Sequence, residues 1–449
     1  MKHTYRHPTS PAAAGALTVM SVASTRYVVT AYDEVVQALE SDGVAVTHIG
    51  LANDLWRDGA ARDTYGSFGY RVHSIPRPSG VTSSQWRTPG VWQELQDALP
   101  TILDSVSKLI DEYHPDVFLI PDDDGPLDVA LIGAFNQRGI PVIYLEHGPG
   151  YAFDLEKTVR FRMATAVRRA RRALTNRVGS LIDLGRTPDR RDLVSASSLP
   201  RVRPTGYNGP YTICSYCGLT RDILIKHGVR PGTIRHTGFP YFDRIVRSRT
   251  GVERSPDCAK RLLVVSSGNI LLAMDDYARG FYEFADRTIR NLAQDFEVSI
   301  RFKPGEERHS LTSQLSDRLA QLNVNVDDNS IVASDAVRRY ALVMGEPSTV
   351  LQEAVILGIP IVVWDFDRAP SQSLTLSSVL AKHLGVLTLR DASRAKRTVV
   401  RAMSEGYRTS LARRLTESGR YVYDNDGAAG KRVAQVVLES VMSRRAARS

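Results

Sequence analysis

The chain has 449 residues, of which 43% are hydrophobic and 24% charged, and this composition is that of a globular protein rather than a disordered or fibrous one. Its formal net charge of +9 is compatible with a phosphorylated substrate, with nucleic acid or with an anionic membrane surface. Three cysteines provide no disulfide framework, so we expect a reducing compartment, and no uncharged apolar run reaches the roughly 18 residues of a membrane span.

The first part of the chain is basic and then rich in Ala and Ser, and we interpret residues 1–24 as a disordered tail. After the tail, short apolar segments predict strands, and apolar residues at helical spacing predict helices between them. Residues 51–90 are polar with weak periodicity, so we expect loops there apart from one short strand. We predict strands at 27–30, 44–49, 71–75, 117–120, 140–145, 211–215 and 233–237, and helices at 33–39, 91–113, 127–137 and 219–227.

Residues 246–260 are polar and unpatterned, and we predict that they link two domains. After this linker the alternation restarts, and repeated strand–helix–strand units with short connections form parallel sheets with helices on both faces. The predicted fold class is therefore α/β, with two doubly wound Rossmann-like domains, 25–245 and 261–425, that face a cleft and are followed by a C-terminal helix at 426–449. We predict further strands at 261–265, 298–302, around 324, and at 341–344, 361–364 and 386–389, and further helices at 275–295, 311–322 and 348–357.

One strand–turn–helix segment, residues 341–366, carries the chemistry on which the functional interpretation depends. Its helix opens at Ser348 or Thr349, directly after a parallel strand, and so lies at the sheet edge where such folds bind ligands. Hydroxyl groups and unpaired backbone N–H groups at a helix N-terminus suit an anionic phosphate. Glu353, on the first turns of the helix, can accept hydrogen bonds from a ribose diol. A routine helix cap with a surface glutamate explains the same residues, so this pattern alone leaves both interpretations open.

Five motifs follow one another along the chain: EHGPG at 146–150, HTGFPYFD at 236–243, RFKPG at 301–305, GEPSTVLQEAVILGIPIVV at 345–363 and DNDGAAGKRV at 424–433. Together they resemble the GT-B glycosyltransferase superfamily over roughly residues 115–435. The nearest resemblance is to the branch of CDP-glycerol glycerophosphotransferases and capsule-polysaccharide transferases, whose members carry two characteristic phrases. The residues that match these phrases are Gly238, Pro240 and Asp243 for the first, and Ser348, Thr349, Glu353, Ala354, Gly358 and Pro360 for the second.

The resemblance implies transfer from a nucleotide-activated donor on the C-terminal domain to an acceptor on the N-terminal domain, without a cofactor or a metal. It implies that Ser348 and Thr349 hold the diphosphate and that Glu353 holds the ribose. A helix N-terminus and a cation can stabilise a departing nucleoside diphosphate, and Arg301 and Lys303 are the expected cations. The expected donor site consists of Ser266, Ser267, Gly268, Asn269, Arg301, Lys303, Glu346, Ser348, Thr349 and Glu353.

Direct displacement also requires a base that takes the proton of the acceptor hydroxyl. His147 is the first candidate, because it follows a strand of the N-terminal domain and histidine exchanges protons near neutral pH. The alternative is that His147 only hydrogen-bonds the neighbouring glycine-rich turn. Asp123 or Asp124 is the second candidate base, and Lys303 completes the catalytic set; a solvated turn explains the aspartate run better than a metal site. Further residues expected along the cleft are Glu146, His236, Gly238 and Asp243.

The remaining signals favour simple explanations. Cys214 and Cys217 form a C-x-x-C pair without further zinc ligands or a thioredoxin-like context, so we expect buried, inert thiols. Residues 154–177 form a strongly basic helical stretch that fits a solvated helix face or an anionic membrane surface. Nucleic acid is not an expected partner, because no binding motif accompanies the charge. We expect a cytoplasmic protein, peripheral at the inner membrane face if the basic stretch binds lipid.

Three functions fit this fold. The first is a transferase that moves a sugar, or a polyol phosphate, from a nucleotide-activated donor to a hydroxyl of a glycan, a lipid-linked acceptor or a small molecule, in the synthesis of cell-envelope polysaccharides or glycoconjugates. The second is an NDP-sugar 2-epimerase like UDP-GlcNAc 2-epimerase, but those enzymes carry a His-Arg-Glu-Asn phrase where this chain reads SSGNILLAMDD at 266–276. The third is a scaffold without activity, which the joint presence of His147, Lys303, Ser348 and Glu353 disfavours.

Overall fold

The chain divides into two compact units. The first consists of Met1–Thr237 with Lys431–Ser449, and the second of Gly238–Gly430, so the second unit is inserted into the first. Residues 238–245, which we had assigned to the first domain from the sequence, group with the second unit. The computed structural model describes residues 16–53, 59–75, 89–123, 126–148, 209–226, 228–249, 256–266, 275–303, 306, 310–322, 324–327, 331–366, 380–418, 421–422 and 426–448.

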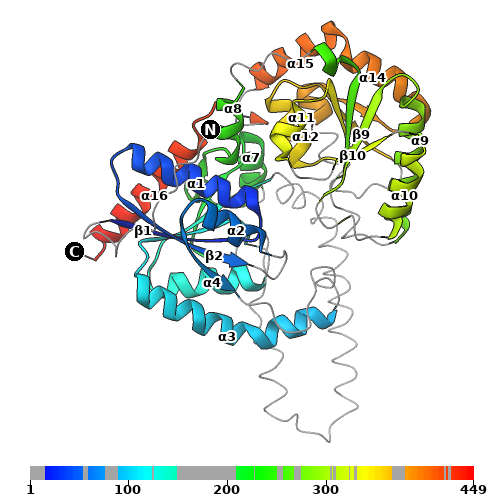
Figure 1. The fold of residues 1–449 in the computed structure, drawn as a ribbon. Coiled ribbons are helices and arrows are strands. Elements are labelled where there is room, and N and C mark those ends of the chain that lie inside the picture. The colour runs from blue at the N-terminus through cyan, green and yellow to red at the C-terminus, as the bar shows by residue number, and fades with distance from the viewer. Residues whose placement is uncertain are drawn as a thin grey trace, which may run out of the picture. The chain divides into compact units, whose positions relative to one another are not determined.

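The first unit is built on a sheet of seven strands in the order β3-β2-β1-β4-β5-β6-β7, and every neighbouring pair is parallel (Figure 1). The chain moves outward from β1 to β3 and then restarts at β4 on the other side of β1. Ligands of such sheets bind at the carboxyl ends of the strands beside this reversal. The strands are β1 (Leu17–Ala23), β2 (Val46–Asn53), β3 (Arg71–Ile75), β4 (Val117–Ile120), β5 (Val142–Leu145), β6 (Thr212–Ser215) and β7 (Ile234–His236), and the helices of this unit include α1 (Arg26–Ser41), α2 (Ala60–Ser67), α3 (Pro89–Tyr113), α4 (Pro126–Gln137) and α7 (Gly218–Lys226).

Strand β1 corrects the prediction that the first 24 residues form a disordered tail. It is buried along its whole length and pairs with both β2 and β4. A parallel strand that is covered on both faces reads as a continuous apolar run without alternation, and this run directly follows the Ala-rich segment with which the prediction grouped it. The predicted strand at 27–30 was also wrong. Its β-branched residues favour a strand locally, but they lie on the buried face of α1, where packing overrides that preference.

The last helix, α16 (Ala429–Ala446), packs mainly on the first unit although it follows the second along the chain. Its Arg444 donates through Nη1 to the backbone carbonyl oxygens of Pro115 at 3.0 Å and Asp116 at 3.2 Å. Arg445 contacts the Asp116 carboxylate at 3.3 Å. Because Asp116 immediately precedes β4, these contacts hold the end of the chain against the segment that leads into a central strand.

The second unit is built on six strands in the order β10-β9-β8-β11-β12-β13, again all parallel (Figure 1). Here the reversal falls between β8 and β11, so the carboxyl ends of these two strands mark the expected ligand site. The strands are β8 (Arg261–Val265), β9 (Glu297–Arg301), β10 (Asn325–Asp327), β11 (Leu342–Gly345), β12 (Ile361–Trp364) and β13 (Leu387–Leu389), and the helices include α8 (Tyr241–Arg247), α9 (Asp275–Leu292), α10 (Ser310–Ala320), α11 (Ala333–Val337), α12 (Thr349–Ile356), α14 (Ala395–Met403) and α15 (Glu405–Ser418).

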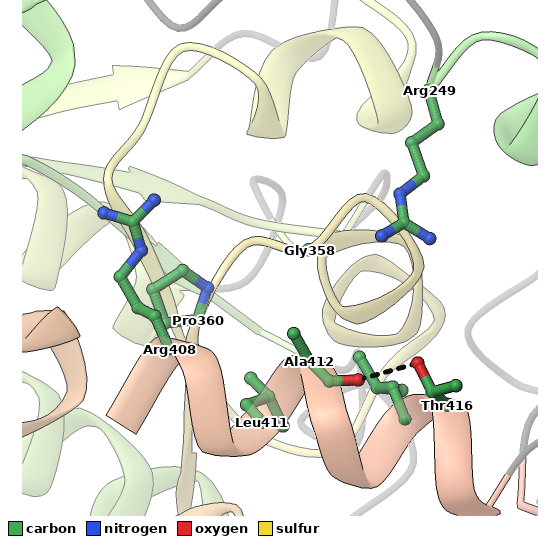
Figure 2. A pocket seen from close by; sticks show the side chains of 8 residues that line it. Arg249, Gly358, Pro360, Arg408, Leu411, Ala412 and Thr416 are labelled. Atoms are coloured by element: carbon green, nitrogen blue, oxygen red, sulfur yellow. Dashed lines mark hydrogen bonds between the residues drawn. The ribbon is translucent and has the colours of Figure 1, made fainter. Parts of the chain in front are cut away.

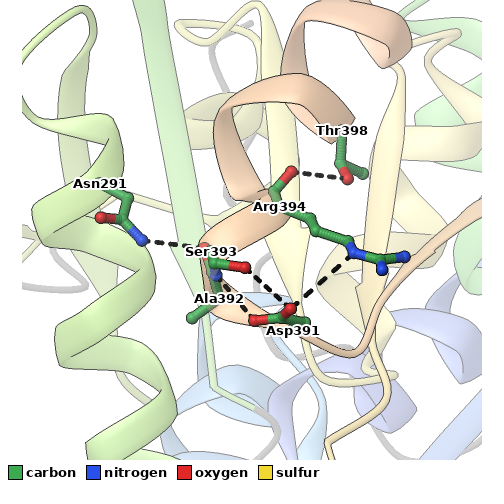
Figure 3. A network of polar contacts seen from close by, with 6 residues as sticks. All are labelled: Asn291, Asp391, Ala392, Ser393, Arg394 and Thr398. Atoms are coloured by element: carbon green, nitrogen blue, oxygen red, sulfur yellow. Dashed lines mark hydrogen bonds and ion pairs between the residues drawn. The ribbon is translucent and has the colours of Figure 1, made fainter.

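An aromatic cluster joins α9 to the second sheet. The Trp364 ring of β12 lies 5.7 Å from the Phe281 ring and 5.2 Å from the Phe284 ring, and all three side chains are buried. The short 3₁₀ helix η5 (Ala392–Arg394) is tied to the same helix, because Asn291 of α9 donates to the Ala392 carbonyl at 2.9 Å (Figure 3). Asp391 caps η5 by accepting from the Ser393 N–H at 2.9 Å. This packing fixes the strands on which the β11–α12 connection is mounted.

The connection between β11 and α12 follows the predicted motif closely. Gly345 ends the strand with φ of +146°, and a Cβ atom at this position would lie 2.0 Å from the Val265 carbonyl oxygen of β8. Ser348 then caps α12, its Oγ accepting from the Leu351 N–H at 3.4 Å. The helix stops before Gly358, which adopts the left-handed conformation that favours glycine.

None of the helices in the ranges given above combines the length and the apolar composition that crossing a bilayer requires. The basic stretch 154–177 lies outside the described residues.

We predict that Gly345→Ala destabilises the protein by about 3 kcal/mol or more, because the methyl group meets a backbone carbonyl that cannot move aside without breaking the β8–β11 pairing. Gly133→Ala in α4 is the matched control. No atom lies within 4 Å of a Cβ there, so the change should be neutral or stabilising by up to about 1 kcal/mol. Urea unfolding of the three proteins, followed by circular dichroism, measures the difference. Equal midpoints for Gly345→Ala and the unmodified protein would contradict the packing described here.

Candidate functional site

The carboxyl ends of β8 and β11 bring Ser266 and the start of α12 to the same edge of the second sheet. Ser348 and Thr349 are both half-buried, so the hydroxyl pair is not enclosed in the core. Within the described part of the chain, the backbone N–H groups of Thr349 and Val350 have no acceptor, as expected for the first turn of a helix. This arrangement presents N–H donors and the positive end of a helix dipole, which together suit a phosphate group.

Glu353 lies one turn further along α12 and is buried, with 2% of its surface exposed. Its Oε1 accepts from the Tyr241 hydroxyl of α8 at 2.9 Å, whereas Oε2 is buried without a hydrogen-bond partner among the described residues. Burial raises the pKa of Glu353 to about 7, although the Tyr241 hydrogen bond and the charge of Arg301 act in the opposite direction. The carboxyl group therefore carries a proton for part of the time at neutral pH. The surface glutamate of the simpler interpretation is excluded by this burial.

Arg301 and Lys303, the two expected cations, have different surroundings. Arg301 is 7% exposed, contacts the Asp327 carboxylate at 3.2 Å and donates to the Ile331 carbonyl at 2.6 Å. Its guanidinium group is thus committed to the segment around β10. Lys303 is half-buried, so its ammonium group is the better candidate for contact with a phosphate.

Glu306 is a residue of this edge that the sequence reasoning missed. It is fully buried and bridges two strands: Oε1 accepts from the Ser266 hydroxyl at 2.7 Å, and Oε2 accepts from the Lys303 N–H at 2.9 Å. The glutamate thereby joins the carboxyl ends of β8 and β9. Glu346, at the end of β11, is buried as well. The predicted residues Ser267, Gly268 and Asn269 lie outside the described residues.

The first unit places His147 at the carboxyl end of β5, beside the reversal of its sheet. The His147 Nδ1 lies 3.0 Å from the Pro121 carbonyl oxygen and 3.7 Å from the Asp122 carboxylate. A carbonyl only accepts, so Nδ1 is the donor and the neutral ring has Nε2 as its acceptor nitrogen. The Asp122 charge would stabilise the ring once it takes up a proton. This tautomer leaves Nε2 as the nitrogen that can take up a proton, and the Nδ1 bond goes to Pro121, the residue after β4.

Two buried carboxyl groups, Glu146 next to this histidine in sequence and Asp123 after β4, interact through their charges. Glu146 is fully buried, and its Oε2 accepts from the Tyr216 N–H and the Thr220 hydroxyl, both at 2.7 Å. Burial raises the pKa of Glu146 to about 7, and the charge of Asp123 adds to the rise. Asp123 is 1% exposed and accepts from the Tyr211 hydroxyl. Asp123 is therefore enclosed, which makes it a weaker candidate base than His147; Asp124 lies outside the described residues.

The HTGFPYFD motif has a structural task in addition to any role near a ligand. Asp243 is 3% exposed, and its two carboxylate oxygens accept from the backbone N–H groups of Ala429 at 3.1 Å and Gly430 at 2.6 Å. It therefore caps the N-terminus of α16. Gly238 has φ of +81°, which explains a glycine at this turn, and His236 is half-buried in β7. The motif thus fixes the start of the last helix.

Cys214 and Cys217 are free and buried, and burial raises the pKa of each thiol to about 12. Thiols of this kind are unreactive at neutral pH. Within the described ranges, no group of three or more His, Cys, Asp and Glu side chains is arranged to hold a metal ion.

Two cavities of the second unit lie away from the start of α12. Figure 2 shows the smaller, of about 50 Å³, at the opposite end of that helix, where Arg249 and Arg408 flank Gly358 and Pro360. The larger, of about 380 Å³, lies at the ends of β12 and β13 and is lined by Gly280, Glu283, Phe284, Arg287, Phe366, Arg390, Asp391 and Ala392. Neither is lined by a residue of the predicted donor site or of the predicted catalytic set.

Several solved enzymes share the fold of this chain. A UDP-GlcNAc 2-epimerase from Neisseria meningitidis bound to UDP-GlcNAc is 13% identical, with a TM-score of 0.59 over 94% of this chain and 100% of that one. The glycotransferase of kitacinnamycin is 16% identical, with a TM-score of 0.59 over 95% and 99%. The UDP-GlcNAc 2-epimerase of Methanocaldococcus jannaschii, in complex with UDP-GlcNAc and UDP, is 12% identical, with a TM-score of 0.57 over 94% and 100%.

The predicted α/β fold class is therefore confirmed: each unit is a Rossmann-like domain on a parallel sheet, as in these solved enzymes of the GT-B fold. No protein family model and no curated protein matches the sequence. Identities this low establish the fold and leave the reaction open.

We predict that Glu146 makes stability depend on pH. Its pKa rises from 4.5 to about 7 on folding, so between these values the folded state binds more protons than the unfolded state, and stability falls as pH rises. The contribution is fully present below pH 4.5 and is lost above pH 7, a change of up to about 3 kcal/mol.

Glu146→Gln should therefore flatten the decline in unfolding free energy between pH 5 and 7.5, as measured by urea unfolding across that range. Glu405→Gln, at the exposed start of α15, is the control and should keep the slope of the unmodified protein. Identical slopes for Glu146→Gln and the unmodified protein would show that Glu146 ionises normally.

Proposed function

We propose that the chain is a transferase that moves a sugar, or a polyol phosphate, from a nucleotide-activated donor to an acceptor hydroxyl. The observation that carries this proposal is the start of α12 at the reversal point of the second sheet. There a capped helix N-terminus with unpaired N–H groups stands one turn before a buried carboxyl group with a free oxygen. A nucleoside diphosphate has the complementary groups in the same order, a pyrophosphate followed by a ribose diol.

The proposed donor site assigns one task to each group. Ser348, Thr349 and the first N–H groups of α12 bind the diphosphate, and Lys303 neutralises the charge that develops as the nucleotide leaves. Glu353 accepts hydrogen bonds from the ribose hydroxyls. Arg301, because it is bound to Asp327, supports the sheet edge and does not contact the leaving group; this revises the expectation from the sequence.

His147 is the proposed base. The acceptor oxygen attacks the transferred group while its proton passes to Nε2 of His147, and the bond from that group to the nucleotide phosphate breaks, with the electron pair leaving on the phosphate oxygen. Fixed by the Pro121 carbonyl, the ring needs no reorientation before it takes the proton. The finer proposal places the chain nearest the CDP-glycerol and capsule-polysaccharide branch, acting on a glycan or lipid-linked acceptor at the cytoplasmic side of the membrane.

An epimerase is the second candidate, because two of the enzymes named above carry that activity in their descriptions. The sequence at 266–276, SSGNILLAMDD, lacks the His-Arg-Glu-Asn phrase of such enzymes and favours transfer. Product analysis separates the two. A transferase releases nucleotide in proportion to the acceptor added, whereas an epimerase changes the sugar without net release.

The nucleotide can be found by thermal denaturation in the presence of CDP, UDP, GDP, CMP and their sugar or glycerol conjugates. A ligand that binds the folded state raises its apparent stability, by about 2.7 kcal/mol at 100 times Kd. We expect one base to stand out. If no nucleotide raises the melting temperature at millimolar concentration, the transferase and the epimerase proposals both fail.

We predict that His147→Ala lowers kcat about 100-fold or more while the Kd of the donor nucleotide stays within about twofold, because the ring acts on the acceptor proton and not on the nucleotide. His73→Ala is the control: His73 lies in β3, at the far edge of the same sheet. Steady-state kinetics and calorimetric nucleotide titration give the two quantities. Full activity of His147→Ala would remove the residue from the mechanism.

A further inference from the structure

The contact between Tyr241 and Glu353 joins two motifs that are more than a hundred residues apart in sequence. Tyr241 opens α8, is 8% exposed and donates its hydroxyl proton to Oε1 of Glu353 at 2.9 Å. Burial, together with the nearby Glu353 charge, raises the pKa of Tyr241 well above its ordinary value. The tyrosine therefore remains a hydrogen-bond donor throughout the physiological pH range and always occupies the same carboxyl oxygen.

The second carboxyl oxygen of Glu353, Oε2, differs from Oε1 in its surroundings. Oε2 of Glu353 is buried and has no hydrogen-bond partner within the described residues. A buried acceptor without a donor is unfavourable by about 1–3 kcal/mol, so a ligand that supplies a hydroxyl group gains that amount. A vicinal diol offers two donors, which match the unpartnered Oε2 and the remaining acceptor capacity of Oε1.

Charged and titratable groups from the elements packed around Glu353 are few. Arg301 at the end of β9 lowers its pKa, and Asp335 of α11 raises it. Arg244 lies on α8 beside Tyr241, and strand β11 has no titratable side chain. None of these forms an ion pair with Glu353 within the described residues. Burial therefore dominates and raises the pKa to about 7, and hydrogen-bond donors from a ligand would favour the ionised form of the carboxyl group.

We propose that Tyr241 is the positioning residue of the donor site: it holds Glu353 so that the carboxylate accepts from the ribose hydroxyls, and nucleotide uptake displaces the Glu353 proton to solvent. This inference rests on the proposed function, because it takes the ligand of α12 to be a ribonucleotide conjugate. The exchange is balanced: one carboxyl O–H bond breaks, the proton leaves to water, and two ribose O–H groups donate to the resulting carboxylate.

A purely structural role for the Tyr241–Glu353 contact makes different predictions. If the hydrogen bond only ties α8 to α12, its loss weakens binding of ribonucleotides and 2′-deoxyribonucleotides equally. If Tyr241 positions the ribose acceptor, its loss discriminates between ribose and 2′-deoxyribose. It also raises the pKa of Glu353, because the donor that stabilises the carboxylate is gone.

The test is calorimetric titration of the full chain with UDP-glucose, CDP-glycerol and GDP-mannose and with their 2′-deoxy analogues. The pyrophosphate diesters of these probes do not ionise between pH 6 and 8, so any pH dependence comes from the protein. For the conjugate that binds, we expect affinity to tighten about tenfold from pH 6 to 8. In two buffers of different ionisation enthalpy, the titrations should show about half a proton released per nucleotide at pH 7, as follows from the Glu353 pKa of about 7.

Tyr241→Phe should weaken the ribonucleotide conjugate about tenfold and the 2′-deoxy analogue less than about threefold, and it should move half-maximal proton release to higher pH. Tyr340→Phe is the matched control. Tyr340 is also buried in the second unit, 7% exposed, and its ring contacts Arg261. Tyr340→Phe should therefore alter neither the affinities for the two conjugates nor the pH of half-maximal proton release.

Equal loss of affinity for both sugars in Tyr241→Phe would overturn the inference. So would the absence of proton release in the unmodified protein, a measurement that remains decisive even if the variant does not fold. If no ribonucleotide conjugate binds the unmodified protein, the proposed function fails together with the inference. If a ribonucleotide conjugate binds, but Tyr241→Phe does not discriminate between ribose and 2′-deoxyribose and no proton is released, the proposed donor site is retained. Only the role of Tyr241 is then rejected.

Discussion

The close approach of β11 to β8 is the constraint on which the second unit depends. At Gly345 the backbone lies so near the Val265 carbonyl that no side chain fits, and this contact sets where the strand ends and where the following helix can begin. Ser348 then caps the helix and directs its N–H groups to the sheet edge that also carries Ser266. The position of the proposed phosphate site is thus a consequence of backbone packing inside the sheet. The hydroxyl groups of Ser348 and Thr349 add binding groups to that position but do not determine it.

The two buried glutamates show how burial competes with hydrogen bonding. Glu146 accepts two hydrogen bonds and Glu353 one, yet the pKa of each rises to about 7. Among the residues that the structure describes, neither glutamate has an ion-pair partner: Asp123 adds a negative charge beside Glu146, and Arg301 near Glu353 is bound to Asp327. A folded protein that keeps such groups without a permanent cation retains sites whose charge can respond to a ligand. That property distinguishes them from Asp243, whose two oxygens are both occupied by backbone donors.

Much of the fold could be predicted from the sequence, because most strands are short apolar runs and most helices have an apolar face. The predicted bounds of β3, β4, β8 and β12 agree with those in the structure. The failures have physical causes: β1 is an apolar run that continues directly from an Ala-rich segment, and α1 is rich in β-branched residues. In the candidate site, the amino-acid sequence around Ser348 predicted a capped helix. They could not reveal that Glu353 is buried against Tyr241, or that Glu306 bridges two strands, because such contacts join residues far apart in sequence.

The insertion of the second unit into the first has a consequence for biosynthesis. Gly238–Gly430 is one continuous segment, whereas the first unit is made of two segments that flank it. Until Lys431–Ser449 has been synthesised, the segment before β4 has no arginines from α16 on its carbonyl groups. Domains generally fold in the order of their synthesis, from the N-terminus onward. Here the second unit can fold first, because all its residues are made before the second segment of the first unit.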